Sequence, residues 1–161
     1  MKSVLNAIDP HEALSIVGCS KGKARGGDTP AGEAGTRWPE PMLHARADVL
    51  AKSKVDDHGL RPAWLRYNGH FYRNVGSAIG EAAAHGRTLI LSGGYGILRA
   101  DEPIAYYDRK LRLSDWPSGV LEHAIIDEAH RIGATKVVGF VSASADYAPS
   151  DYPPGMVTTR V

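Results

Sequence analysis

The sequence has a single cysteine, Cys19, among its 161 residues. One thiol cannot form an intramolecular disulfide, and it excludes a zinc or iron–sulfur site built from clustered cysteines. The chain also lacks an apolar run of the roughly 18 residues that a membrane helix needs, since its longest run, 136–145, is interrupted by a glycine and serines. The first ten residues hold no apolar core of a signal peptide. We therefore expect a cytoplasmic protein that does not interact with a membrane.

The sequence also has almost no excess of positive over negative side chains, because its net charge is only +1. This is far from the basic footprint of a DNA-packaging protein. The charge is uneven, +4 over residues 1–99 and −3 over 100–161, which is compatible with a partner that bears phosphate. The seven histidines show neither His-x-x-x-His nor His-Glu-x-x-His spacing, so no metal is expected. No Walker loop or Gly-x-Gly-x-x-Gly motif is present, and we expect no cofactor.

Apolar segments typical of buried strands alternate with segments of helical period, which predicts an α/β fold. The expected strands are 14–19, 88–92 and 135–141, and the expected helices are about 41–55, 70–85 and 118–132. The length fits one domain, 1–161, with three layers: a largely parallel sheet flanked by helices. We expect the glycine-rich segment 24–38 to be a mobile loop, 95–116 to be a long functional loop, and 146–161 to be an irregular tail.

Ligands of parallel sheets gather beyond the carboxyl ends of the strands, and the first such end carries unusual chemistry. It reads Gly-Cys-Ser-Lys-Gly-Lys over 18–23, where Ser20, Lys21 and Lys23 are suited to hold a phosphate. Cys19 could be a nucleophile, although a cysteine at a strand end is more often a small buried apolar residue.

The second strand end reads Ser-Gly-Gly-Tyr-Gly over 92–96. Its glycines allow a sharp turn whose N–H groups would form an anion-binding nest. Arg99 would add a bidentate donor for a phosphate, and Asp101 and Glu102 follow as acids. The alternative is a tight turn followed by solvated charges, with Arg99 paired to Asp101.

A third segment, 66–73, interleaves aromatic and basic side chains, as segments that stack on bases and pair with phosphates do. Tyr67, Asn68 and Gly69 are its candidate contacts. The alternative is a hydrophobic anchor for the following helix, with Phe71 and Tyr72 in the core.

Together these segments resemble the YaaA superfamily, named for a bacterial peroxide-stress protein. Residues 91–107, Leu-Ser-Gly-Gly-Tyr-Gly-Ile-Leu-Arg-Ala-Asp-Glu-Pro-Ile-Ala-Tyr-Tyr, resemble the family pattern Leu-Ser-Gly-x-Tyr-Gly-x-Leu-Arg-x-x-Asp-x-Ile-x-x-Tyr. Lys21 stands at the lysine of the family's first motif, and 67–69 resembles its Tyr-x-Gly motif. Ala100 replaces a proline common in longer members, and a helical DNA-binding insertion has no room here. The chain is therefore similar to the compact single-domain branches.

The resemblance implies association with nucleic acid or nucleotides. The leading hypothesis is an N-glycosidase, a DNA glycosylase that excises a modified base, for example in defence against phages. Its oxocarbenium-like transition state needs a carboxylate, for which Asp101 or Glu102 is the candidate, and Tyr95, which would contact the base, is the third expected catalytic residue. The expected substrate-binding residues are Cys19, Ser20, Lys21, Lys23, Tyr67, Asn68, Gly69, Tyr72, Ser92, Gly93, Gly94, Gly96, Arg99 and Asp108.

Two alternatives stay open, a non-catalytic DNA-binding protein of oxidative stress and an N-glycosidase of free nucleotides. Acidic side chains beside the basic ones favour an enzyme, because carboxylates would repel a phosphate that is merely held. Ion pairs with Arg99 and Arg109 would explain the same acids. The base, the strandedness of the DNA and the oligomeric state are not specified by these residues.

Overall fold

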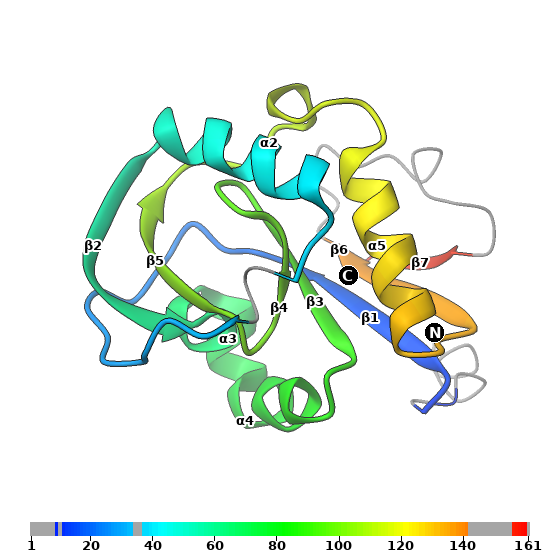
Figure 1. Ribbon diagram of the computed structural model, residues 1–161. Coiled ribbons are helices and arrows are strands. Elements are labelled where there is room, and N and C mark those ends of the chain that lie inside the picture. Colours follow the sequence, from blue (N-terminus) through cyan, green and yellow to red (C-terminus); the bar gives the residue numbers. More distant parts are fainter. Residues whose placement is uncertain (1–8, 10, 34–36, 142–155, 161) are drawn as a thin grey trace.

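A five-stranded sheet forms the centre of the protein, in a computed structural model that describes residues 9, 11–33, 37–141 and 156–160 (Figure 1). The strand order is β4-β3-β1-β6-β7. β1 pairs in parallel with β3 and β6, β6 pairs in parallel with β7, and β4 is antiparallel to β3. The strands are β1 (Ala13–Gly18), β3 (Thr88–Ser92), β4 (Gly96–Arg99), β6 (Lys136–Val141) and β7 (Met156–Arg160).

A second, two-stranded antiparallel sheet lies beside the first and was not expected. It pairs β2 (Lys54–Pro62) with β5 (Pro103–Asp108), and its register shifts between Asp56 and Arg61. The protein is therefore a mixed α/β domain and its strands are not all parallel. The segment 95–116, expected to be one long loop, instead contains β4 and β5.

The helices are α2 (Glu40–Ala51), α3 (Ala63–Arg66), α4 (His70–Ala84) and α5 (Val120–Arg131), and Leu113–Asp115 form a 3-10 turn. α2 and α5 lie on one face of the large sheet, and α3 and α4 lie on the other (Figure 1). None of the described helices is long and apolar enough to cross a membrane. The predicted helix ends at Gly86 and Gly133 are confirmed, since both glycines have a positive φ of +67°.

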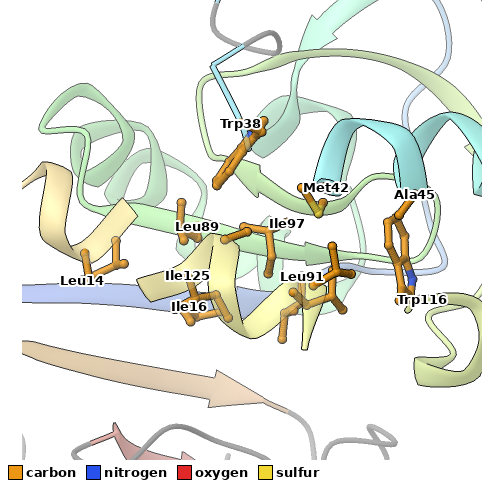
Figure 2. Packing of buried hydrophobic residues seen from close by; sticks show 14 of the residues in the cluster. Leu14, Ile16, Trp38, Met42, Ala45, Leu89, Leu91, Ile97, Trp116 and Ile125 are labelled. Carbon is orange, nitrogen blue, oxygen red and sulfur yellow. The ribbon is translucent and has the colours of Figure 1, made fainter. Parts of the chain in front are cut away.

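Alternating residues of β3 divide the core between the two faces, as the pleat of a strand requires. Leu89 and Leu91 belong to the cluster under α2 and α5, while Ile90 belongs to the cluster under α3 and α4. Figure 2 shows the first cluster, in which Met42 from α2 and Ile125 from α5 lie together with Leu91. Both faces of β3 are thus buried, which explains its uninterrupted apolar sequence.

The described part of segment 24–38 is tied to the rest of the fold by Arg66. One terminal nitrogen of this buried side chain donates to the carbonyls of Ala24 and Gly26, at 2.6 and 2.9 Å. The other donates to carbonyls in β2 and β5. The guanidinium therefore joins this loop to both strands of the small sheet. Residues 156–160 of the expected irregular tail form β7, and 146–155 and 161 lie outside the described residues.

Candidate functional site

The carboxyl ends of β1 and β3 lie side by side, because the two strands are parallel neighbours. Cys19 follows β1, and its N–H donates to the carbonyl of Leu91 at 2.8 Å. Ser92 is the last residue of β3. The structure therefore places the first and second predicted segments at the same edge of the sheet.

Three buried hydroxyl groups meet at this edge, and we call Tyr67, Ser92 and Tyr107 the hydroxyl cluster. The Tyr67 hydroxyl lies 3.0 Å from Ser92 Oγ and 2.7 Å from the Tyr107 hydroxyl, and Ser92 Oγ lies 2.8 Å from the Tyr107 hydroxyl. Burial raises the pKa of both tyrosines well above the ordinary value. The cluster therefore stays neutral and consists of hydrogen-bond donors and acceptors that stabilise one another.

The backbone N–H groups of the glycine-rich turn are used within the protein. Tyr95 N–H donates to Ser92 Oγ at 3.1 Å, while the N–H groups of Gly94 and Gly93 face the Tyr107 hydroxyl and the Cys19 thiol and act to lower the pKa of each. These contacts differ from the anion-binding nest that the sequence suggested. A phosphate would have to displace the Ser92 oxygen, the Tyr107 hydroxyl and the Cys19 thiol to reach these amides.

Close packing explains why glycines occupy this turn. A Cβ atom at Gly94 would lie 2.7 Å from the Tyr107 ring, and one at Gly93 would collide with the carbonyl of Arg109. Gly96 has a φ of +75° and packs against Met42. The three glycines let the turn lie directly on its neighbours.

Lys23 brings a cation to the hydroxyl cluster. Its backbone forms a bridge with Tyr67, and its ammonium lies 4.5 Å from the centre of the Tyr107 ring and 5.9 Å from that of Tyr67. The side chain is half-buried. Burial lowers the pKa of Lys23, while the nearby Cys19 and Asp108 act in the opposite direction. A partly dehydrated amine thus lies at the strand ends beside an acidic side chain.

The thiol of Cys19 is not activated by this environment. Burial raises its pKa above the ordinary value of 9.0, and the Gly93 N–H, Lys23 and Tyr107 offset this only in part. The thiol is therefore protonated at neutral pH, whereas the nucleophilic form of cysteine is the thiolate. The structure favours the interpretation of Cys19 as a packed residue at the end of a strand.

The third predicted segment joins the same edge through a hydroxyl group. Ser20 Oγ accepts a hydrogen bond from the N–H of Gly69 at 3.1 Å and donates to the carbonyl of Gly22 at 2.6 Å. The N–H of Asn68 donates to the same carbonyl at 3.0 Å. These contacts fix the loop after β1 against the start of α4 and leave Lys21 exposed.

Tyr72 is part of the core, as the alternative interpretation of this segment held. It is 4% exposed, and its hydroxyl donates to the carbonyl of Gly18 at 2.7 Å. Phe71, which the same interpretation placed in the core, is 40% exposed. The Tyr72 ring therefore supports the end of β1, and the Phe71 ring lies at the surface.

Glu102 lies elsewhere and has buried partners. Its carboxylate is 1% exposed and accepts hydrogen bonds from Arg46 Nη1 at 2.6 Å, from Trp38 Nε1 at 3.0 Å and from the Arg99 N–H at 3.2 Å. This ring of donors leaves no approach for a sugar. The placement of Glu102 conflicts with the expected catalytic role.

The ion pair of Arg46 and Glu102 covers the open edge of the large sheet. Arg46 also donates to the carbonyls of Tyr95 and Ile97, at 3.0 and 2.7 Å, beside the Arg99 N–H that Glu102 accepts. Since β4 is an edge strand, these backbone groups have no strand partner of their own. The pair replaces a missing neighbouring strand.

Arg99 is paired as well, but with a residue that the sequence did not indicate. It makes two hydrogen bonds to the Glu128 carboxylate, at 2.9 and 2.8 Å, and lies 4.2 Å from the Trp38 ring. Asp101 is exposed. The alternative interpretation therefore named the wrong partner, because Arg99 pairs with the buried carboxylate of Glu128 and not with Asp101.

The antiparallel course of β4 explains why these residues are separated from the strand ends. Gly96 pairs with Ser92 at the carboxyl end of β3, whereas Arg99 pairs with Leu89 near its amino end. The chain thus leaves the hydroxyl cluster along β4. Asp101, which follows, and Glu102 lie beyond the far end of β3 and do not join the cluster.

Asp108 is the one carboxylate whose charge acts on Lys23, although no described hydrogen bond or ion pair joins the two side chains. It is exposed, follows Tyr107 directly at the end of β5, and acts on the charge of Lys23. A cavity of about 350 Å³ borders it. This cavity is also lined by Tyr106, whose ring lies 4.3 Å from the Arg25 guanidinium.

Sequence reasoning missed Tyr107 as a site residue, although it lies within the quoted motif. At the end of β5, Tyr106 is half-buried, Tyr107 is buried and Asp108 is exposed, whereas the sequence Pro-Ile-Ala-Tyr-Tyr-Asp has no alternation of polar and apolar residues that could have indicated which tyrosine points inward. Arg46 and Glu128 carried no local pattern either.

Comparison with models of known protein families finds no match, and comparison with curated proteins finds none either. The similarity to the YaaA superfamily therefore stays a prediction. Within the described part of the chain, no group of three or more histidine, cysteine or acidic side chains is arranged to hold a metal ion.

Proposed function

We propose that this protein cleaves N-glycosidic bonds in DNA and excises a modified base at the carboxyl ends of β1 and β3. The observation that carries the proposal is the position of Lys23, over the Tyr107 ring and close to Asp108. An amine, a carboxylate and a rigid neutral support lie where parallel sheets bind ligands. A protein that only grips phosphate has no use for the carboxylate.

The chemistry assigns the carboxylate role to Asp108. As the bond between C1′ and the base breaks, positive charge develops on the sugar, and an adjacent carboxylate stabilises it or activates water. Glu102 is enclosed by Arg46 and Trp38, and Asp101 lies at the other end of β3. Asp108 combines exposure with a position beside Lys23.

The hydroxyl cluster supports the site from below. Its rings and hydroxyl groups are buried, so they hold the Lys23 ammonium in position and do not reach the substrate. Lys21 and Asn68 are exposed in the adjoining loops and are suited to contact phosphate and base. The target base would have to leave its stack to reach such a site. A cytoplasmic enzyme of this kind would act on DNA with altered bases, such as that of phages.

Base release is the direct test. Oligonucleotides with modified and unmodified bases, in single and double strands, are incubated with the protein, and abasic sites are revealed by alkaline strand cleavage. We expect release from a modified substrate and a loss of about 10²–10⁴-fold for Asp108→Asn. Asp127→Asn, an exposed acid on α5, serves as the control. Full activity of Asp108→Asn, or a loss confined to Asp101→Asn, would reject the assignment.

The same experiment separates the two alternatives. Binding of unmodified DNA that weakens steeply with salt, without any base release, would identify a non-catalytic DNA-binding protein. Release of bases from free nucleotides, detected by chromatography, would identify a nucleotide N-glycosidase. The exposed or half-exposed cations Lys21, Lys23 and Arg25 are compatible with either ligand.

A further inference from the structure

We propose that the Lys23 amine is the nucleophile of this site and forms a Schiff base with C1′ of the deoxyribose. The inference rests on the proposed function and makes it more specific. A protein that works in this way removes the base and can also cleave the strand at the resulting abasic site. The substrate is therefore a polynucleotide, with a 3′-phosphate that can leave.

Position distinguishes Lys23 from the other lysines. Lys23 is the one half-buried lysine among the residues that the structure describes. The exposed ones are Lys21, Lys52, Lys54, Lys110 and Lys136. Its backbone is fixed by the bridge to Tyr67, and its side chain lies along the rings of the hydroxyl cluster. A nucleophile held in this way loses little conformational freedom when it attacks.

The surroundings also favour the reactive form of the amine. A lysine attacks carbon only when it is neutral, and burial lowers the pKa of Lys23. The described ion pairs do not include Lys23, whereas Arg46, Arg99 and Arg109 are each paired with a carboxylate at 2.6–2.8 Å. Asp108 is close enough to act on the charge of Lys23, and a proton would pass between the two side chains through water.

The steps balance without a cofactor or oxidant. The Nζ lone pair forms a bond to C1′ as the bond from C1′ to the base breaks, and the base leaves with that electron pair and is protonated by water. Through a water molecule, Asp108 takes the proton that Nζ loses and returns it to O4′ when the sugar ring opens, which leaves an iminium between Nζ and C1′. Water then takes a proton from C2′, the electron pair of that C–H bond forms a C2′–C3′ double bond, and the 3′-phosphate leaves. A further water molecule hydrolyses the imine and restores the amine.

An abasic oligonucleotide tests this step without knowledge of the base. The protein is mixed with an oligonucleotide that carries one preformed abasic site, and sodium borohydride reduces any imine to a stable amine. We expect a covalent adduct whose tryptic peptide maps to Lys23, together with strand cleavage when borohydride is omitted. Lys23→Ala should lower both by more than about 10²-fold. Lys110→Ala, an exposed lysine whose backbone packs beside Gly93, should react like the wild type.

Mapping the adduct on the wild-type protein keeps the test decisive if Lys23→Ala does not fold. An adduct on another lysine, or none, overturns the inference. Base release from a modified oligonucleotide with no adduct and an intact strand overturns it while the proposed function stands. An adduct on Lys23 without base release from any oligonucleotide supports the nucleophile and rejects base excision. The rate of adduct formation should also reach half of its maximum at a pH below about 10.4, at which an ordinary lysine titrates.

Discussion

The two ends of β3 carry buried polar groups of opposite kinds. At the carboxyl end, three neutral hydroxyl groups bond to one another beneath Lys23. At the amino end, the buried Glu128 carboxylate accepts two hydrogen bonds from Arg99 and two from Arg131. Buried charges that are fully paired hold a structure together, and they have little capacity left for a ligand. At the neutral end, Lys23 is not part of any described ion pair and lies over the rings of Tyr67 and Tyr107.

The largest loss of stability is expected when a carboxylate is removed from the buried ion pairs around β4. Glu102→Ala should lower the free energy of unfolding by about 3–5 kcal/mol, because it leaves the buried Arg46 without its carboxylate. Denaturant titration measures the loss. Asp101→Asn, which alters an exposed neighbour, should change the free energy by less than about 0.5 kcal/mol. Equal effects of the two substitutions would contradict the structural role of Glu102.

A pair of glycine substitutions examines the packing of the neutral end. Gly94→Ala should destabilise the protein by about 1–3 kcal/mol, since the new Cβ atom would lie 2.7 Å from the Tyr107 ring. Gly18→Ala has no atom within 4 Å of its added carbon and should be neutral or stabilise by up to about 1 kcal/mol. Thermal or denaturant unfolding of both variants gives the comparison, and a stable Gly94→Ala protein would show that the turn is loosely packed.

Removal of one hydroxyl group from the cluster should have a smaller effect. Tyr107→Phe should cost about 0.5–1.5 kcal/mol, because Tyr67 and Ser92 remain 3.0 Å apart and still bond to each other. Its ring stays under Lys23, so borohydride trapping should persist. Loss of trapping in a folded Tyr107→Phe protein would give the hydroxyl group itself a part in the reaction.

The last expected effect is a change in how stability depends on pH, and it is confined to acid. Burial raises the pKa of Glu128, but hydrogen bonds and charges from Arg131 and Arg99 outweigh it and bring the pKa to about 2, below the ordinary 4.5. A carboxyl whose pKa is lowered by folding stabilises the protein above 4.5 and loses this contribution as pH falls towards 2. Unfolding measured from pH 5 to 2 should therefore depend less steeply on pH for Glu128→Gln, and identical slopes would contradict the pairing.

Local patterns predicted much of the fold. The apolar runs at 88–92 and 135–141 and the helical period at 70–85 are reproduced to within one residue by β3, β6 and α4. β2 was missed because Asp56 and His58 are polar in sequence, and their strand is defined by a partner about fifty residues away. No local pattern contains that pairing.

The candidate site was likewise predictable from the sequence only in part. Cys19 and Ser92 could be placed together because each ends an apolar strand and neighbouring parallel strands end at one edge. The distance of Asp101 from that edge could not be predicted from the motif, where it stands only nine residues after Ser92. Once β4 turns back along β3, each residue carries the chain farther from the site.

Apolar runs and helical period thus specified β1, β3, β6 and the longer helices, because burial of apolar side chains follows the turns of a helix and the pleat of a strand. Which charges neutralise each other was decided by the folded arrangement. Arg99 finds Glu128 on a helix that comes much later in the chain, and Lys23 finds the rings of Tyr67 and Tyr107. Electrostatic pairing depends on distances in space, and these follow from how the two sheets and the helices pack.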